Sequence, residues 1–203
     1  MAHDFLFKFI LAGDSSVGKT AILQRFTDAE FKSATEYEAT VGVDFKTKNV
    51  SIEGKEVMIM TWDTAGQETY RSFTRSYFRG SAVVLLVYDV TSRSSFDSIP
   101  SWIKDVLEHA DNPNLGLVIV GNKKDSALRK VQTDEGAALA AQNGDLLFFE
   151  TSAKTGEGVH EVFIDAAKQF YKKFQDGLVD FTSDSQGLTL GPKQINQSGK
   201  CSC

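Results

Sequence analysis

GDSSVGKT at residues 13–20 lies between an apolar run, residues 5–12, and a segment with helical periodicity. Glycines at both ends of this loop let the backbone curl so that successive N–H groups point at an anion, and the following helix adds its positive N-terminal end. The lysine supplies charge for the outer phosphates, and the threonine hydroxyl supplies an oxygen ligand for Mg2+. The alternative is a plain Gly/Ser turn, but the strand-then-helix context favours a phosphate-binding loop. Its predicted contact residues are Ser15, Ser16, Val17, Gly18, Lys19 and Thr20.

Bulk composition excludes several classes of protein. The 203 residues are 41% hydrophobic and 24% charged, which suits one globular domain plus a tail. A net charge of -5 argues against binding to a nucleic acid polymer, which needs clustered lysine and arginine. No apolar run is long enough to cross a bilayer, and residues 1–4 lack the basic start of a signal peptide, so a cytosolic protein is expected. With Cys201 and Cys203 as its two cysteines, the chain has no disulfide framework.

Strand and helix patterns alternate along the chain. The alternation predicts an α/β fold, a mostly parallel six-stranded sheet with helices on both faces and ligand loops at the carboxyl ends of the strands. Ser94 and Asp97 form a capping-box pattern, and an apolar stripe that includes Leu107 predicts one helix from there to Ala110. We expect a ligand-binding domain at 1–175 and a flexible tail at 176–203. The expected strands are residues 5–12, 43–52, 57–62, 81–89, 115–120 and 146–149, with an antiparallel hairpin at Glu53-Gly54-Lys55; the other helices follow Thr20, span 133–141 and begin near Val159.

Two polar motifs follow late strands and would select the base of a nucleotide. In Asn122-Lys123-Lys124-Asp125, the Asp125 carboxylate offers two acceptors in one plane, which match the ring N–H and amine of guanine. Adenine has no such donor pair, so we expect guanine specificity. In the 150–154 segment ETSAK, the backbone N–H of Ala153, flanked by Ser152, is the expected donor to the guanine oxygen, and the stems of Lys123 and Lys154 can cover the purine. An NKxD pattern alone is a common polar loop; the ordered set of three motifs carries the prediction.

These motifs together resemble the five nucleotide-site motifs of Ras-superfamily GTPases. The resemblance covers residues 5 to about 175 and rests on GDSSVGKT, TVGVDF at 40–45, WDTAGQE at 62–68, NKKD and ETSAK. TVGVDF, RSYFRG at 75–80 and the terminal CSC at 201–203 are more similar to Rab proteins, without naming a subfamily. The resemblance implies a GTP/GDP switch that hydrolyses GTP with Mg2+ and recruits effectors in vesicle trafficking.

The resemblance also implies roles for residues of the phosphate side. Thr40 would bind Mg2+ and sense the terminal phosphate, Asp63 would hold Mg2+ through water, and the Gly66 N–H would contact the same phosphate. Gln67 would orient the attacking water, although it could also be a solvated loop residue. Catalysis would thus rest on Gln67, Lys19 and Thr40. No arginine lies inside the phosphate motifs, so we expect slow intrinsic hydrolysis and an arginine from an activating protein.

Four aromatic residues match further family positions. Phe31 lies where the family places the aromatic that edges the guanine, and the alternative is a core phenylalanine that closes the first helix. Phe45, Trp62 and Tyr77 match the aromatic trio through which Rab surfaces meet effectors; the alternative is ordinary packing on the sheet.

The C-terminal cysteines are the expected lipid sites. Cys201 and Cys203 would carry geranylgeranyl groups, because one lipid anchors only marginally and the acidic tail offers no polybasic signal. A Cys-x-Cys metal site is the alternative, but it lacks further ligands. The implied location is the cytoplasmic face of an intracellular membrane, with cycling through the cytosol. The implied partners of this presumed monomer are an exchange factor, an activating protein, effectors, a prenyl escort and a GDP-dissociation inhibitor.

The sequence departs from the family pattern in two places. Residues 31–40 are about two residues longer than usual, which leaves open whether Tyr37 or a neighbour covers the phosphates. Thr69 and Tyr70 stand where Rab proteins commonly have Arg and Phe. Two other functions stay open: a nucleotide-binding interaction module with negligible hydrolysis, and an ATP-dependent kinase, which Asp125 argues against.

Overall fold

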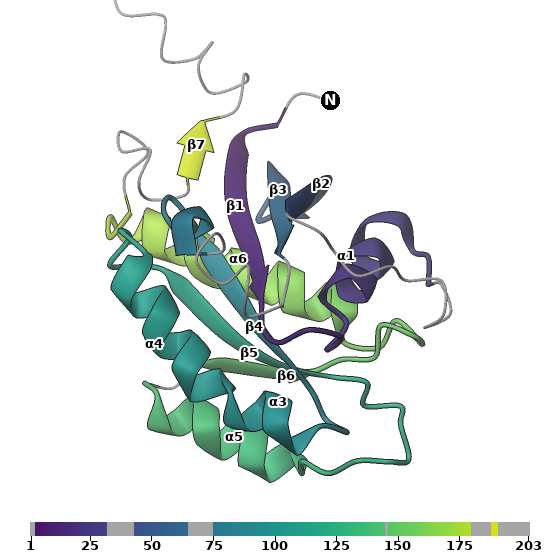
Figure 1. Ribbon diagram of the computed structural model, residues 1–203. Coiled ribbons are helices and arrows are strands. Elements are labelled where there is room, and N and C mark those ends of the chain that lie inside the picture. The colour runs from purple at the N-terminus through teal and green to yellow at the C-terminus, as the bar shows by residue number, and fades with distance from the viewer. Residues whose placement is uncertain (1–2, 32–42, 65–74, 145, 180–187, 191–203) are drawn as a thin grey trace, which may run out of the picture.

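The computed structural model describes residues 3–31, 43–64, 75–144, 146–179 and 188–190. They form one central sheet with helices packed on both of its faces (Figure 1). This mixed, mostly parallel architecture confirms the predicted fold class. The elements are β1 (Phe5–Ala12), α1 (Lys19–Asp28), β2 (Val43–Ile52), β3 (Lys55–Thr64), β4 (Val83–Asp89), α3 (Arg93–Asp97), α4 (Ile99–His109), β5 (Gly116–Asn122), α5 (Thr133–Gln142), β6 (Leu147–Glu150), α6 (Val159–Gln175) and β7 (Leu188–Leu190).

The strand order places the phosphate loop at the middle of the sheet. The order is β2-β3-β1-β4-β5-β6, in which β1 pairs in parallel with β3 on one side and β4 on the other. Only the β2–β3 hairpin is antiparallel within this path, as its two-residue turn requires. Because parallel strands end at one common edge, the loops after β1, β3, β4, β5 and β6 meet there.

Alternating residues of the buried strands build two cores. Phe7 and Phe9 of β1 pack against α1 and α6, where the rings of Phe26 and Phe163 stack with centroids 3.9 Å apart. On the other face, Ile10 packs with side chains of α3 and α4, such as Trp102. Every residue of β4 is buried, as expected for a central strand covered on both faces.

The segment predicted as one helix from Ser94 is two helices, α3 and α4. Pro100 has no N–H to donate to the carbonyl of residue 96, so the first helix ends before it and a second begins. The cap is also earlier than predicted, because the Ser92 side chain accepts from the Ser95 N–H. Leu107, placed on the buried stripe by periodicity, is 64% exposed. The stripe is thus narrower than the sequence pattern suggested.

A seventh strand extends the sheet beyond the six that were predicted. Residues 188–190 pair antiparallel with β1, Leu188 opposite Phe7 and Leu190 opposite Phe5. They cover the part of β1 that β4 leaves open, since β4 pairs only from Phe9 onward. Leu188 is buried in the same core as Phe7. This part of the predicted tail therefore belongs to the fold.

No helix among the described residues combines the length and apolar character needed to span a bilayer.

Candidate nucleotide site

The phosphate loop follows β1 and is held close to its neighbours by two glycines. Gly13 has φ 139°, and a Cβ there would lie 2.1 Å from the carbonyl oxygen of Val87 on β4. Gly18 has φ 99°, and its Cβ would lie 2.4 Å from Nδ2 of Asn122. Both positions therefore require glycine, for backbone conformation and for space. These constraints fix the loop against β4 and the end of β5.

Lys19 lies inside this loop. Its Nζ donates to the carbonyls of Gly13 at 2.8 Å and Asp14 at 2.7 Å, and the residue is 6% exposed. Burial lowers the lysine pKa to about 8, while the charges of Asp63 and Asp14 oppose the shift. A buried ammonium that two carbonyls of the phosphate loop hold in place is well placed to bind an anion.

Thr20 and Asp63 bring two oxygen ligands together from α1 and β3. The threonine hydroxyl donates to Asp63 Oδ2 at 2.5 Å, and Asp63 is 2% exposed. Hydroxyl and carboxylate oxygens are the ligands that Mg2+ prefers, so this pair fits the predicted metal site. The structure thus places two of the three predicted metal ligands side by side.

Asn122 connects the phosphate loop to the base-binding segments. From the end of β5, its Nδ2 donates to the Val17 carbonyl at 2.9 Å. Its Oδ1 accepts from the Thr151 hydroxyl and from the Ala153 N–H, both at 3.2 Å. The whole asparagine is 1% exposed. One buried side chain therefore holds residues 17, 151 and 153 together.

Asp125 and Ser152 also meet, as the predicted base site requires. The Ser152 hydroxyl donates to Asp125 Oδ1 at 2.7 Å. That bond fixes the carboxylate in the loop after β5 against the loop after β6. Lys123 forms an ion pair with Asp89 at 2.6 Å and donates to the Ser16 carbonyl at 2.9 Å. The predicted base-binding residues are thus brought to the same edge as the phosphate loop.

Phe31 and Lys154 lie beside this group. Phe31 is 36% exposed and belongs to neither core, so its interpretation as a core phenylalanine is wrong. The centroid of its ring lies 5.9 Å from the guanidinium carbon of Arg25. The same guanidinium donates a hydrogen bond to the Lys154 carbonyl at 2.6 Å. Both residues are therefore linked to α1.

The predicted aromatic trio is contiguous on the sheet. Phe45 and Trp62 have ring centroids 5.3 Å apart, and Trp62 and Tyr77 are separated by 5.4 Å. Phe45 is 51% exposed, whereas Trp62 and Tyr77 are half-buried against the core next to α4. The trio is thus both packed and accessible, and its role toward effectors stays a prediction.

Several predicted residues lie outside the described part of the chain. They are the switch residues Thr40, Gly66 and Gln67, the neighbours Tyr37, Thr69 and Tyr70, and the lipid sites Cys201 and Cys203. Their roles stay predictions.

Two side chains with contacts to the site were not singled out from the sequence. Trp102 of α4 donates through Nε1 to Asp14 Oδ1 at 2.9 Å, which ties the phosphate loop to that helix. Arg25 of α1 donates to the loop after β6. Trp102 lies within the predicted apolar stripe and Arg25 lies on the predicted first helix. Neither pattern indicated these distant partners, because the contacts form only in the folded chain.

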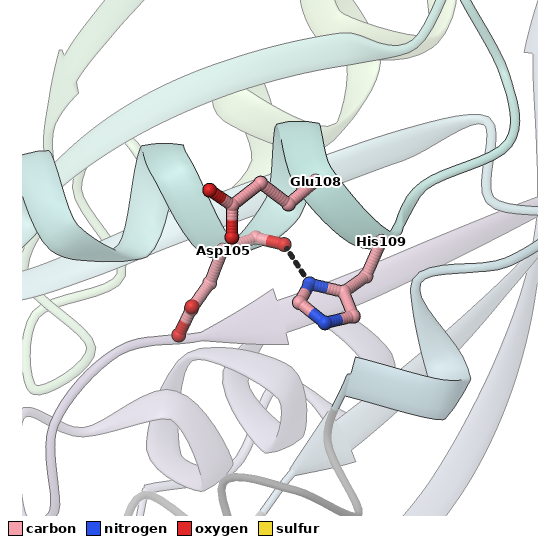
Figure 2. A group of neighbouring side chains, drawn as sticks. All are labelled: Asp105, Glu108 and His109. Carbon is pink, nitrogen blue, oxygen red and sulfur yellow. Dashed lines mark hydrogen bonds between the residues drawn. The ribbon is translucent and has the colours of Figure 1, made fainter.

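A second group of potential metal ligands lies on α4, away from the phosphate loop. Figure 2 shows that the side chains of Asp105, Glu108 and His109 project from neighbouring turns of α4. The distance between His109 Nδ1 and the Asp105 carbonyl oxygen is 2.8 Å. The Asp105 carboxylate accepts from Arg75 at 3.1 Å, so an arginine already balances its charge. We therefore assign no metal to this group.

A phosphate loop after the first strand, a Thr–Asp oxygen pair, and an aspartate held by Ser152 in the loop after β5 define a P-loop nucleotide-binding protein. A comparison with family models narrows the class: the Ras family model matches residues 8–172. The chain belongs to the Ras family. It is therefore a small GTPase. Proteins of this family in general bind GTP and GDP with Mg2+, hydrolyse GTP, and act as switches with exchange factors, activating proteins and effectors.

Proposed function

We propose that this protein is a Rab-like GTPase that recruits effectors in intracellular vesicle trafficking while attached to the cytoplasmic face of a membrane. The observation that carries the nucleotide part of the proposal is the junction at Asn122, which joins the phosphate loop to Ala153. The Rab part rests on the aromatic trio Phe45, Trp62 and Tyr77 and on the terminal CSC sequence.

In this proposal the phosphate side performs the chemistry. The backbone of residues 15–18 and the Lys19 ammonium bind the outer phosphates and stabilise charge as the terminal phosphoryl group leaves. Thr20 and Thr40, with Asp63 through water, would hold Mg2+, which would neutralise phosphate charge. Gln67 orients the water that attacks the terminal phosphorus. Loss of that phosphate then releases the segments of Thr40 and Gly66, which changes the effector surface.

The base side selects guanine. Asp125, fixed by Ser152, accepts from the ring N–H and the amine, and the Ala153 N–H donates to the guanine oxygen. Asp125→Asn replaces one acceptor with a donor, which matches the second carbonyl of xanthine. We expect GDP affinity to fall by about 100-fold and xanthosine diphosphate affinity to rise, measured by nucleotide competition. Retention of GDP preference in the variant would contradict the assigned role of Asp125.

The proposed role of Gln67 in GTP hydrolysis distinguishes this function from that of a nucleotide-binding module, which would signal only through whether GTP or GDP is bound. Gln67→Leu removes the group that orients water but leaves Asp125 and Lys19 intact. We expect stimulated GTP turnover to fall by about 1,000-fold with little change in GTP affinity. Unchanged turnover would favour the binding module.

The aromatic trio can be tested with the same GTP-loaded variant. If effectors bind to it but no longer bind when Phe45→Ala is added, the trio is supported as their contact surface.

Membrane attachment is proposed through geranylgeranyl groups on Cys201 and Cys203, with a prenyl escort and a GDP-dissociation inhibitor as partners. Two chains are needed because one prenyl group binds membranes only marginally. Mass spectrometry of membrane-bound protein from cells is expected to find two prenyl additions. An unmodified C-terminus on that protein would contradict the anchor.

A further inference from the structure

Arg25 makes an unusual set of contacts from the last turn of α1. Its Nε donates to the Ala153 carbonyl at 2.8 Å and its Nη2 to the Lys154 carbonyl at 2.6 Å. Nη1 donates to the Ala29 carbonyl at 2.9 Å, just beyond the end of the helix. The planar guanidinium holds three carbonyls in a fixed arrangement that a lysine ammonium could not reproduce. One arginine therefore ties α1 to a loop more than a hundred residues away.

The carbonyl that Arg25 holds lies in the loop that carries the Ala153 N–H. That N–H donates to Asn122 Oδ1 at 3.2 Å. Other contacts hold the flanks of the loop: the Ser152 N–H donates to the Glu157 carbonyl, and the Gly156 N–H to the Ser152 carbonyl. Arg25 holds residues 153–154 between these flanks. Residue 153 is therefore held through its N–H by Asn122 and through its carbonyl by Arg25.

The same guanidinium also lies near Phe31. The distance from its central carbon to the ring centroid is 5.9 Å, within the range of a cation–π contact. Phe31 is the residue predicted to edge the guanine ring. Arg25 therefore contacts residue 153 and lies close to residue 31, two parts of the proposed base site that are far apart in the sequence.

We infer that Arg25 is a positioning residue for guanine: it fixes the Ala153 N–H that recognises the oxygen at position 6 of the base and supports the Phe31 ring beside it. The inference rests on the proposed guanine site. Within the described part of the chain, the side chain of Arg25 bonds to Ala29, Ala153 and Lys154 and lies near Phe31, so it acts on affinity for the base through Ala153 and Phe31. Its contribution should therefore depend on the oxygen that Ala153 recognises.

Three diphosphates test this dependence on purified full-length protein. GDP carries the oxygen, the ring N–H and the amine. Inosine diphosphate keeps the oxygen and the ring N–H but lacks the amine, and 2-aminopurine riboside diphosphate keeps the amine but lacks both the oxygen and the ring N–H. For Arg25→Leu we expect affinities for GDP and inosine diphosphate to fall about tenfold, and affinity for the 2-aminopurine nucleotide to fall less than about twofold. Arg25→Lys retains a positive charge near Phe31 but loses the planar set of N–H donors. It should show the same pattern of affinities with a smaller loss.

Arg79→Leu is the matched control, because Arg79 is exposed and pairs only weakly with Asp111 at 3.5 Å. It should leave all three affinities unchanged. An equal loss for all three nucleotides in both Arg25 variants would show that the arginine acts on general stability and would overturn the inference. If instead the wild-type protein does not prefer GDP to the 2-aminopurine nucleotide, the proposed guanine site itself fails. The two failures are thus distinguishable.

Discussion

The two halves of the nucleotide site are stabilised in different ways. The phosphate half depends on backbone conformation: Gly13 and Gly18 have positive φ, and their missing side chains allow close contact with β4 and β5. The base half depends on side chains that bond to distant backbone, with Arg25 and Asn122 both reaching residue 153. A loop built from glycine positions its amides by local geometry. A loop held by long-range hydrogen bonds can be changed by substitutions outside it.

The largest expected effect is on the phosphate half. Lys19→Met removes the charge that the loop surrounds, so affinity for GDP should fall by about 100- to 1,000-fold. The melting temperature should not fall, because burial already disfavours the charged lysine, as its pKa of about 8 indicates. Nucleotide titration and thermal unfolding without nucleotide measure the two quantities. A large loss of stability would show that Lys19 also holds the loop together.

A glycine pair tests how far the loop depends on backbone. Gly13→Ala places a methyl group 2.1 Å from the Val87 carbonyl oxygen at φ 139°, and we expect the free energy of unfolding to fall by about 3 kcal/mol or more. Gly54 in the β2–β3 turn has φ 77° but nothing within 4 Å of a Cβ, so Gly54→Ala should cost about 1 kcal/mol. Chemical denaturation measures both. Equal losses would mean that the contact with β4 is unimportant.

Asn122→Ala tests the junction between the halves. It removes the bonds to Val17 and Ala153 together, and a loss of about 2 kcal/mol in GDP binding is expected, seen as faster GDP release. Asn122→Asp keeps the acceptor for Ala153 but loses the donor to the Val17 carbonyl. It should therefore impair phosphate binding more than base selectivity. The ratio of GDP to inorganic diphosphate affinity reports the difference.

The smallest effect is expected on the base half alone. Ser152→Ala removes the hydroxyl that donates to Asp125 but leaves the carboxylate itself. Affinity for GDP should fall about fivefold, since one hydrogen bond contributes roughly 1 kcal/mol. Affinity for inorganic diphosphate should not change. A loss shared by both ligands would contradict the separation of the two halves.

Local patterns predicted much of the fold and the site. The apolar strands, the phosphate loop and the Asp125 segment each carry their signal within about ten residues, so the mostly parallel sheet and the ligand loops at its edge followed from local patterns. The pairing of Thr20 with Asp63 was implied by the family resemblance alone. Pro100 was a visible signal for the break between α3 and α4, but the apolar stripe outweighed it.

Other features could not be predicted because they depend on tertiary contacts. Arg25 and Ala153 are 128 positions apart, and Trp102 and Asp14 are 88 apart; no local pattern links either pair. Leu107 lies at the margin of a helix face whose buried width depends on the neighbouring sheet. The three residues of β7 are too few to show a period, and their strand exists only because β4 leaves part of β1 unpaired.

β7 and the phosphate loop lie at different ends of β1. Leu190 lies opposite Phe5, whereas the phosphate loop begins after Ala12, so the two are separated along β1 by roughly 23 Å at the usual strand rise. Figure 1 shows β7 beside the N-terminal half of that strand. The last described residue, Leu190, therefore lies at the end of β1 that is remote from the phosphate loop. β7 and the phosphate loop thus mark opposite ends of the same central strand.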